Sequence, residues 1–440
     1  MDTQNTFYHG DCLFVMKHDI APESVDLIYL DPPFFTGKIQ RGKWQPGAME
    51  VSFEDSKQFW KEKGVSVHAP EWMKHLAISQ NRPDFASYLY YMMERLQACR
   101  RVLNIKGSIY LHCDWRASHY LKMVMDEIFT ESNFRNEIVW YYGPKATQSG
   151  SQFQSKHDII LYYVKKKGQQ CFNPQLQEYS EGSLCERDTR YKHKDAHGIY
   201  RLTTRRDSKG DKYRAKVYLK PGVSMTDVWN IGVINSTAKE RSGYPTQKPQ
   251  KLLERIIKAS SKDGDTVLDP FCGCGTTVIM ASKLNRRFIG IDIDTSKRTK
   301  GKLPTAFNVI KRGSHELFNQ ARYVSRDITE VLEMNSLEFE DWVNEYYKAD
   351  KPHPDKGIDG VTQDGVPIQV KSFQVTYKTI SQFVTDVKYH ANVPKPIKKV
   401  IIVSQTGFDD GARQRKFEIE TAEGITIELA TPQEMLTLET

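Results

Sequence analysis

The chain has 440 residues, of which 39% are hydrophobic and 27% charged, and a formal net charge of +8. This length predicts two or three domains, and the composition is typical of globular proteins rather than of disordered or fibrous ones. No apolar run is as long as a membrane span and the N-terminus lacks a signal-peptide pattern, so we expect a cytoplasmic protein without membrane association. The seven cysteines show no paired zinc spacing, which favours free thiols in a reducing compartment.

The positive charge is unevenly distributed along the chain. From Tyr323 onward there are 13 Lys/Arg and 20 Asp/Glu, a balance of −7, so the preceding part carries +15. A basic body followed by an acidic piece is expected of a polyanion-binding part joined to a different domain. A basic surface that contacts only solvent is the alternative.

The first predicted elements lead to a rigid loop. A strand over Thr6–His9 and a helix over 13–19 precede an apolar run over 24–30 that is typical of a buried parallel strand. The run ends in Asp31-Pro32-Pro33-Phe34, where proline fixes φ and removes a hydrogen-bond donor. Residues 35–80 lack clear periodicity, which predicts a long loop with short helices beside the active site.

Strand and helix patterns alternate along much of the remaining chain. Helices are predicted over Tyr88–Leu103, Ala117–Phe129, Leu252–Ala259 and Thr277–Leu284, and strands over Ser108–His112, Glu137–Tyr142, Asp158–Val164, Thr266–Leu268 and Arg287–Ile291. This alternation predicts an α/β fold with a parallel, doubly wound sheet. Such sheets bind ligands at the carboxyl ends of their strands, where the Asp31 loop is expected.

Residues 173–228 interrupt the alternation with a basic, turn-rich segment. Its cationic side chains are interleaved with Tyr191, Tyr200 and Tyr213, and they are Arg187, Arg190, Lys192, Arg201, Arg205, Arg206, Lys209, Lys212, Arg214 and Lys216. This composition is typical of a nucleic-acid backbone contact. A flexible, solvated insertion is the alternative.

The Asp31 loop offers a carboxylate, the carbonyl of Pro32 and the aromatic face of Phe34. Together these groups suit an amino group on a flat ring, since they supply two acceptors for its N–H bonds and one stacking surface. For this tetrapeptide taken alone, a proline-rich turn that merely ends a strand is the alternative.

A second loop, Leu268-Asp269-Pro270-Phe271-Cys272-Gly273-Cys274-Gly275-Thr276-Thr277, lies between a predicted strand and helix. Its glycines let the backbone turn tightly and approach a ligand, and Asp292 ends the next strand, where an acid can bind ribose hydroxyls. A dinucleotide-binding dehydrogenase is the competing interpretation, but the third glycine of that fingerprint is missing. The acid and proline before the glycines suit a cationic, amino-acid-bearing ligand better than a pyrophosphate.

These motifs resemble those of DNA amino-methyltransferases, which methylate the exocyclic nitrogen of adenine or cytosine. The Asp31 loop is similar to the family's Asp-Pro-Pro-Tyr/Phe motif, and the Asp269 loop to its Asp-Pro-Phe-x-Gly-x-Gly-Thr motif. Tyr244-Pro245-Thr246-Gln247-Lys248-Pro249 is similar to its His-Pro-Thr-Gln-Lys-Pro motif, although alone it also fits a helix N-terminus. The resemblance covers roughly residues 6–295, and the motif order is that of the permuted β class, with the target-recognition region between the motifs.

The resemblance implies a Rossmann-like, S-adenosylmethionine-dependent methyltransferase sheet in permuted order. It implies catalytic roles for Asp31, Pro32, Pro33 and Phe34. It implies that S-adenosylmethionine is bound by Asp11, Cys12, Thr246, Gln247, Lys248, Asp269, Phe271, Gly273, Gly275, Thr276 and Asp292.

The resemblance also implies methyl transfer to adenine N6 of a base flipped out of double-stranded DNA, because Asp before Pro-Pro leans to adenine in this family and Ser to cytosine. Three alternatives stay open: cytosine N4 as the target, an RNA or small-molecule methyltransferase, and a nucleic-acid-binding protein with a decayed site.

The C-terminal segment carries a second constellation. A strand over Gly357–Val361, a turn at Asp364-Gly365 and a strand over Ile368–Lys371 predict a hairpin that brings Asp359, Gln369 and Lys371 together. This pattern resembles Mrr-like restriction endonucleases, which implies Asp359 and Gln369 on Mg²⁺ or Mn²⁺, with Lys371 and Glu340 nearby. A hairpin that keeps its fold without cleaving is the alternative.

The predicted domain order is a methyltransferase domain at 1–300 with target recognition at about 173–232, a linker at 301–330, and the nuclease-like domain at 331–440. The chain has no Gly-x4-Gly-Lys-Ser/Thr loop, so any motor is expected on a separate subunit. A restriction–modification system, with a restriction or motor subunit or a homodimer as partners, fits this organisation.

Overall fold

The computed structural model describes residues 5–43, 50–53, 55–143, 153–177, 191–219, 222–235, 238, 240–242, 244, 246–293, 310–311, 314, 317, 320–327, 331–332, 334–351, 357–389, 393 and 395–436. Cys185, Arg187 and Arg190 lie outside these ranges. Within the described ranges, no helix has the length and apolar character needed to span a membrane.

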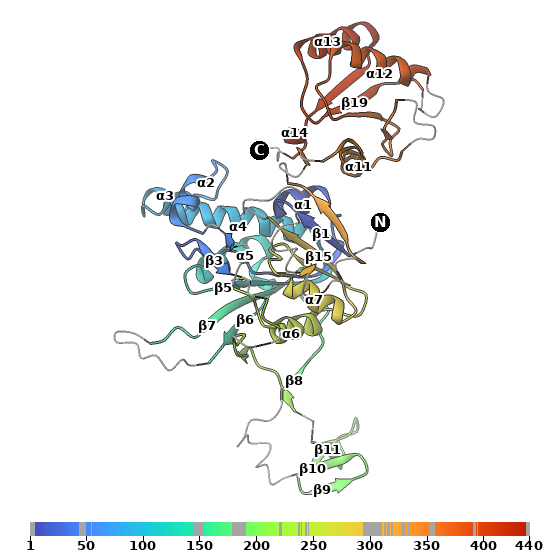
Figure 1. Ribbon diagram of the computed structural model, residues 1–440. Helices are drawn as coiled ribbons and strands as arrows, with labels where there is room; N and C mark the ends of the chain where they lie inside the picture. The colour runs from blue at the N-terminus through green and yellow to red at the C-terminus, as the bar shows by residue number, and fades with distance from the viewer. Residues whose placement is uncertain are drawn as a thin grey trace.

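A nine-stranded sheet forms the body of the described chain, in the order β13-β6-β7-β5-β2-β14-β15-β1-β16 (Figure 1). Its strands are β1 (Thr6–His9), β2 (Val25–Leu30), β5 (Leu103–Cys113), β6 (Phe134–Tyr141), β7 (His157–Val164), β13 (Val228–Asn230), β14 (Thr266–Asp269), β15 (Arg287–Asp292) and β16 (Arg322–Ser325). The prediction of a parallel sheet is wrong for β7, which pairs antiparallel with both β5 and β6. Because β6 and β7 are consecutive and pair directly, a parallel pairing would need a crossover long enough to return to the other end of the sheet.

Helices cover both faces of this sheet, and β2 shows why. Its side chains alternate: Ile28 and Leu30 pack into one hydrophobic core, and Leu27 and Tyr29 into another. The first core contains residues of α1 (Cys12–His18), α4 (Pro83–Val102) and α5 (Ser118–Phe129). The second core contains residues of α6 (Gln250–Ser260) and α7 (Thr276–Lys283). A short 3-10 helix, η1 (Glu131–Asn133), follows α5. The helices after the neighbouring strands β2 and β14 therefore pack on opposite faces, which creates a crevice between the ends of these strands.

Residues 35–80 contain the short helices that were expected, together with a hairpin that was not. The elements are β3 (Gln40–Lys43), β4 (Glu50–Phe53), α2 (Lys57–Lys63) and α3 (Glu71–Ile78). The buried Asp55 carboxylate accepts from the backbone and hydroxyl of Thr36, each at 2.7 Å, and from Trp60 Nε1 at 2.8 Å. This carboxylate fixes the loop that follows the Asp31 motif.

The predicted linker at 301–330 includes a strand of the body. β16 pairs in parallel with β1, and Ile310 and Leu317 are buried in the core beside α7. Burial of these apolar side chains and the free edge of β1 explain why the segment joins the sheet.

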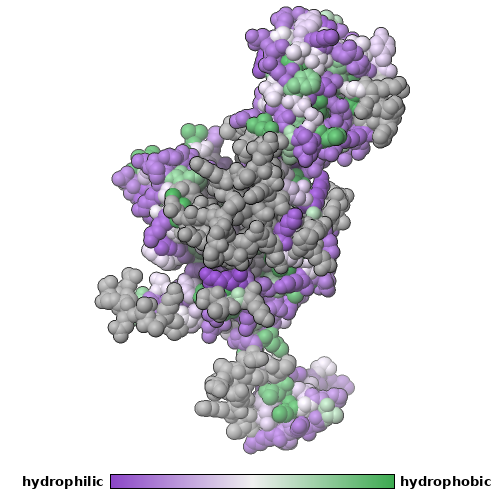
Figure 2. Space-filling view, in the orientation of Figure 1, coloured by the Kyte–Doolittle hydropathy of each residue, from purple (hydrophilic) through white to green (hydrophobic). Residues whose placement is uncertain are grey.

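The insertion and the C-terminal unit lie at opposite ends of the body in Figure 1. The insertion contains β8 (Leu176–Gln177), β9 (His193–Asp195), β10 (Gly198–Arg206), β11 (Lys212–Tyr218) and β12 (Val223–Ser224). The C-terminal unit contains α11 (Ser336–Tyr347), β17 (Gly360–Val361), β18 (Pro367–Lys371), α12 (Tyr377–Tyr389), β19 (Lys399–Ser404), α13 (Asp410–Glu423), β20 (Thr426–Ala430) and α14 (Pro432–Met435). The predicted hairpin in this unit is confirmed, since β17 and β18 pair antiparallel in a four-stranded sheet. Hydrophilic residues predominate on the visible coloured surface (Figure 2).

Candidate active site

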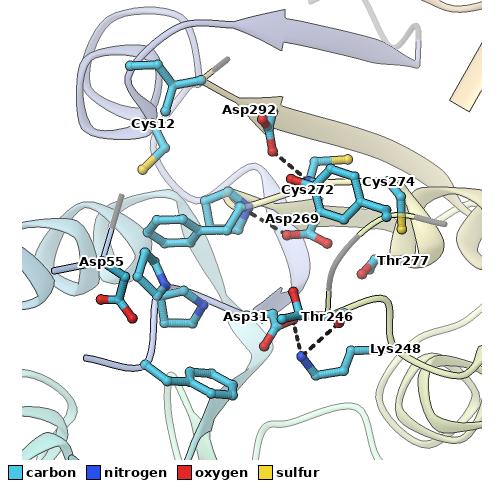
Figure 3. Close-up of a pocket in the computed structure, with 18 of the residues that line it drawn as sticks. Cys12, Asp31, Asp55, Thr246, Lys248, Asp269, Cys272, Cys274, Thr277 and Asp292 are labelled. Atoms are coloured by element: carbon cyan, nitrogen blue, oxygen red, sulfur yellow. Dashed lines mark hydrogen bonds and ion pairs between the residues drawn. The ribbon is translucent and has the colours of Figure 1, made fainter. Parts of the chain in front are cut away.

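A cavity of about 280 Å³ opens at the carboxyl ends of β2, β14 and β15 (Figure 3). All predicted catalytic and cofactor-binding residues line it except Gly275; these lining residues are Asp11, Cys12, Asp31, Pro32, Pro33, Phe34, Thr246, Gln247, Lys248, Asp269, Phe271, Gly273, Thr276 and Asp292. Five separated segments of the sequence therefore form one site.

The two oxygens of the Asp31 carboxylate have different hydrogen-bond environments. Its side chain is 17% exposed, and Oδ2 contacts the ammonium of Lys248, which also donates to the carbonyl of Thr246 at 3.3 Å (Figure 3). Within the described residues, Oδ1 is buried and has no hydrogen-bond partner. A buried acceptor without a donor is costly, so this oxygen fits a ligand N–H group.

The rest of the Asp31 loop is held by aromatic residues. The hydroxyl of Tyr88 donates to the carbonyl of Pro33 at 2.9 Å, and the buried Phe35 ring packs 5.0 Å from that of Phe85. The Lys248 ammonium lies 5.1 Å from the centroid of the Phe34 ring. The Phe34 ring thus makes a cation–π contact with Lys248, and a flat ring can also stack on it.

The glycine loop closes on Asp292. The backbone N–H of Gly273 donates to Asp292 Oδ2 at 2.6 Å, and Gly273 and Gly275 have φ values of +50° and +77°. A Cβ at Gly275 would lie 2.5 Å from Cγ1 of Ile310, so this position requires glycine for packing as well as for backbone conformation. Gly275 supports the loop from behind and does not line the cavity.

Asp269 is a buried carboxylate at the base of the site. Burial raises its pKa to about 7, although hydrogen bonds from the Thr277 side chain and the Phe271 backbone oppose the rise. Thr277 also lines the cavity. The sequence analysis included it at the end of the glycine loop but gave it no role.

The predicted residues in the segment 240–248 have different roles. Gln247 Oε1 accepts from the backbone and hydroxyl of Ser242, both at 2.8 Å, and its Nε2 donates to the carbonyl of Glu240 at 2.7 Å. Thr246 adopts a positive φ of 63°. Gln247 therefore holds the loop in shape, and Lys248 carries the charge into the cavity.

Asp11 and Cys12 approach the cavity from the start of α1. Asp11 accepts from the backbone N–H of Leu13 at 2.7 Å as the helix N-cap, and its other oxygen pairs with the buried Arg95 at 2.6 Å. Burial raises the pKa of the Cys12 thiol to about 12, so this side chain is neutral. Arg95, which the sequence analysis missed, fixes the carboxylate beside the cavity.

Three further residues beside Asp31 were also missed as a group: Tyr29, His112 and Asp158. His112 Nδ1 lies 2.9 Å from the Tyr29 hydroxyl and 3.7 Å from Asp31 Oδ1, and its Nε2 lies 3.2 Å from Asp158 Oδ2. The pairing of β2 with β5 and of β5 with β7 brings these residues together, which no spacing in the sequence could reveal.

The insertion presents cations on one face of the β10–β11 ribbon, which is part of a three-stranded sheet with β9. Arg206 pairs across from Lys212, and Arg214 lies two residues further along β11, so all three project from the same face and are exposed. Arg205 projects from the opposite face beside Tyr213. Another cation on the first face, Lys216, is paired with Asp195 at 2.7 Å.

The C-terminal constellation assembles in part. Lys371 Nζ lies 3.8 Å from Asp359 Oδ2, and Gln369 Oε1 is buried without a hydrogen-bond partner in the described chain. Asp359 also accepts from the backbone of Val370 at 2.6 Å, and Glu340 pairs with Lys351 at 2.8 Å. Among the described residues, no cluster of three or more His, Cys, Asp or Glu suits a metal ion.

A family model matches more than half of the chain. A family model for N6/N4 methyltransferases, described as DNA methylase, matches residues 25–299. A curated relative, DNA adenine methyltransferase YhdJ of Escherichia coli, is 29% identical over 74% of this chain and 87% of its own length. Type II methyltransferase M.HpaI of Haemophilus parainfluenzae is 28% identical over 62% of this chain and 82% of its own. Among solved structures, the cytosine-N4-specific PvuII DNA methyltransferase aligns with a TM-score of 0.40 and 12% identity, covering 72% of this chain and 94% of the other.

Proposed function

The chain belongs to the DNA methylase family, and from this premise we propose that it transfers a methyl group from S-adenosylmethionine to adenine N6 at specific sites in double-stranded DNA. The observation that carries the proposal is Asp31 Oδ1, which is buried and has no hydrogen-bond partner among the described residues, in a cavity also lined by Phe34, the glycine loop and Asp292. The similarity to DNA adenine methyltransferase YhdJ supports adenine over cytosine.

The residues present fit the cofactor. When bound, S-adenosylmethionine supplies an electrophilic methyl group. Asp292 would accept hydrogen bonds from its ribose, Lys248 and Thr246 would hold its carboxylate, and the anionic walls of the cavity suit its positive charge. No residue of this chain needs to form a covalent bond to the substrate.

Asp31 and Phe34 would hold the flipped base. The two N–H bonds of an exocyclic amine would donate to Asp31 Oδ1 and to the carbonyl of Pro32, and the ring would stack on Phe34. Both hydrogen bonds draw the nitrogen lone pair out of conjugation with the ring, and they fix its direction for in-line attack. The chain thus acts mainly by positioning.

The basic ribbon face would bind the DNA backbone. Arg206, Lys212 and Arg214 are exposed and project together, as phosphate contacts require, while the body supplies the catalytic cavity. We therefore propose the insertion as the target-recognition region.

Mapping of methylated bases tests the proposed function. DNA from cells expressing the wild-type chain or Asp31→Ala is sequenced for N6-methyladenine and N4-methylcytosine. A single methylated adenine motif that is lost in the variant is the expected result. Methylcytosine at the motif would favour the N4 alternative, and methylation of RNA alone would overturn the DNA substrate.

We also propose that the C-terminal unit is a metal-dependent nuclease, because Lys371 and Asp359 lie side by side next to the buried Gln369 amide. Asp359 and Gln369 Oε1 would hold Mg²⁺, which would activate water and polarise the phosphate. Unmethylated and methylated plasmids are incubated with the intact chain and with Lys371→Ala, with and without Mg²⁺. Cutting of unmethylated plasmid that needs both Lys371 and Mg²⁺ is expected, and equal cutting by the variant would contradict the assignment.

A further inference from the structure

His112 is a buried histidine at the end of β5 that contacts the active-site carboxylate from behind. Its side chain is fully buried, between the rings of Phe34 at 5.3 Å and Trp140 at 5.5 Å. Aromatic packing alone would suit an apolar residue at this position. The three polar neighbours of the imidazole instead give it partners at both ring nitrogens.

Each nitrogen of the ring faces an oxygen. Nε2 lies 3.2 Å from Asp158 Oδ2, and Nδ1 lies 2.9 Å from the Tyr29 hydroxyl and 3.7 Å from Asp31 Oδ1. In the neutral ring, Nε2–H donates to Asp158 and the Tyr29 hydroxyl donates to Nδ1. Rotation of that hydroxyl lets Nδ1 take up a proton without losing a partner, since the Tyr29 oxygen can also accept.

Two carboxylates and one phenol hydroxyl surround the ring. Burial by itself would raise the pKa of Asp158, but the hydrogen bond and charge of His112, together with Lys248, lower it, so Asp158 is anionic. Burial holds the pKa of Tyr29 well above its usual value, so this hydroxyl stays neutral. Asp158 on one side and Asp31 on the other therefore place a carboxylate oxygen near each ring nitrogen of His112.

We propose that His112 accepts, through Asp31, the proton that the target amine loses during methyl transfer. The inference rests on the proposed function. The amine nitrogen uses its lone pair to form the bond to the methyl group, while the carbon–sulfur bond breaks and leaves its electron pair on sulfur. The methylated nitrogen then holds one proton too many. That proton passes to Asp31 Oδ1 and from there to His112 Nδ1, and it leaves to solvent after the product departs.

The first test needs no cofactor or DNA. Histidine side chains are labelled with ¹⁵N, and the His112 signal is assigned by its absence in His112→Gln. Because Asp31 stabilises the imidazolium and Lys248 opposes it, Asp31→Asn is expected to move the His112 titration to lower pH, and Lys248→Met to higher pH. A titration that neither variant moves would overturn the coupling.

The second test measures the pH dependence of single-turnover methyl transfer. Because His112 must be neutral to accept the proton, the wild-type rate should rise with pH as the ring loses its charge. His112→Gln can still donate to Asp158 but does not titrate, so the rise should disappear and the rate at pH 8 should fall at least about tenfold. The other charged or ionisable side chains that face the ring or its partners are Tyr29, Asp31, Asp114, Tyr142, Asp158, Lys248 and Asp269.

Matched variants separate this role from a structural one. Tyr142 donates to Asp158 at 3.5 Å but does not touch His112, so Tyr142→Phe should keep the rise with pH. Asp158→Asn removes the counter-charge and should shift the rise to lower pH, which also serves if His112→Gln fails to fold. An unchanged profile in His112→Gln or Asp158→Asn would overturn the proposal. A wild-type chain that methylates no DNA would instead overturn the proposed function.

Discussion

The Lys248 ammonium contacts the carboxylate of Asp31 across 217 positions of sequence, and both side chains line the same cavity. The contact occupies one Asp31 oxygen and leaves the other, Oδ1, buried and without a hydrogen-bond partner in the described chain. Lys248 also lies over the Phe34 ring, where the target base is proposed to stack. The proposed base and the Lys248 ammonium would therefore both contact this ring.

Replacement of Asp31 should separate methyl transfer from cofactor binding. Asp31→Asn keeps the side-chain size but removes the charge that holds the amine, so we expect transfer to fall at least about 100-fold. Affinity for S-adenosylmethionine should be largely unchanged, because its predicted contacts lie on other loops. Calorimetry and a tritium-methyl transfer assay check the two expectations, and near-normal turnover would remove Asp31 from the catalytic site.

Asp292→Ala should weaken S-adenosylmethionine binding by about 1–3 kcal/mol, since a charged hydrogen bond is lost. The same carboxylate accepts from Gly273 N–H at 2.6 Å, so the variant also loosens the glycine loop. Asp292→Asn keeps an acceptor for Gly273 and serves as the control. Unchanged affinity in Asp292→Ala, measured by calorimetry, would assign the ribose to another residue.

Stability should depend on pH through Asp269. Its pKa in the folded protein is about 7, above the value of 3.8 for an exposed carboxyl, so the folded state binds more protons between these values. Stability from this group is therefore present below about pH 4 and is lost as pH rises towards 7, at up to about 1.4 kcal/mol per pH unit. Chemical denaturation at a series of pH values should show this loss in the wild type relative to Asp269→Asn, and parallel curves would contradict it.

Charge removal on the two faces of the β10–β11 ribbon should have unequal effects. Arg214→Ala should weaken DNA binding and lower the slope of log affinity against log salt by about 0.9, the value for one phosphate contact. Arg205→Ala removes the same charge from the opposite face and should change the slope less. Fluorescence anisotropy at several salt concentrations measures both, and equal slopes for the two variants would contradict a one-sided contact.

Arg326 should couple the stability of the body and the C-terminal unit. Its guanidinium is 1% exposed and contacts Asp19 of the body at 2.7 Å and Glu345 of α11 at 3.4 Å. Arg326→Ala leaves the Asp19 carboxylate buried without this cation, so we expect a loss of about 3–5 kcal/mol and separate melting of the two units. Arg322→Ala removes a more exposed cation from the same Glu345 and should have a smaller effect. Calorimetric unfolding distinguishes the outcomes, and a single unshifted transition in Arg326→Ala would contradict the coupling.

The sequence by itself determined the two loops that were predicted to act in catalysis and cofactor binding and that line the cavity. The conformation of these loops depends on local chemistry: proline fixes φ, glycine allows a positive φ, and a carboxylate ends the strand. These residue types are adjacent in the sequence, in Asp31-Pro32-Pro33 and from Asp269 to Thr276, so the loops can be recognised from it. Strand-and-helix alternation likewise predicted the sheet and its layers, because periodicity reflects burial on one face or both.

Only the tertiary structure decided which distant residues meet. The reversed β7 and the pairing of β5 with β2 place Asp158 and His112 behind Asp31, and the loop before α6 brings Lys248 to its other side. The structure also moved β16 from a predicted linker into the sheet, because pairing with the β1 edge depends on a neighbour more than 300 positions away. Strand register and long-range ion pairs arise from packing between segments, and no local pattern encodes them.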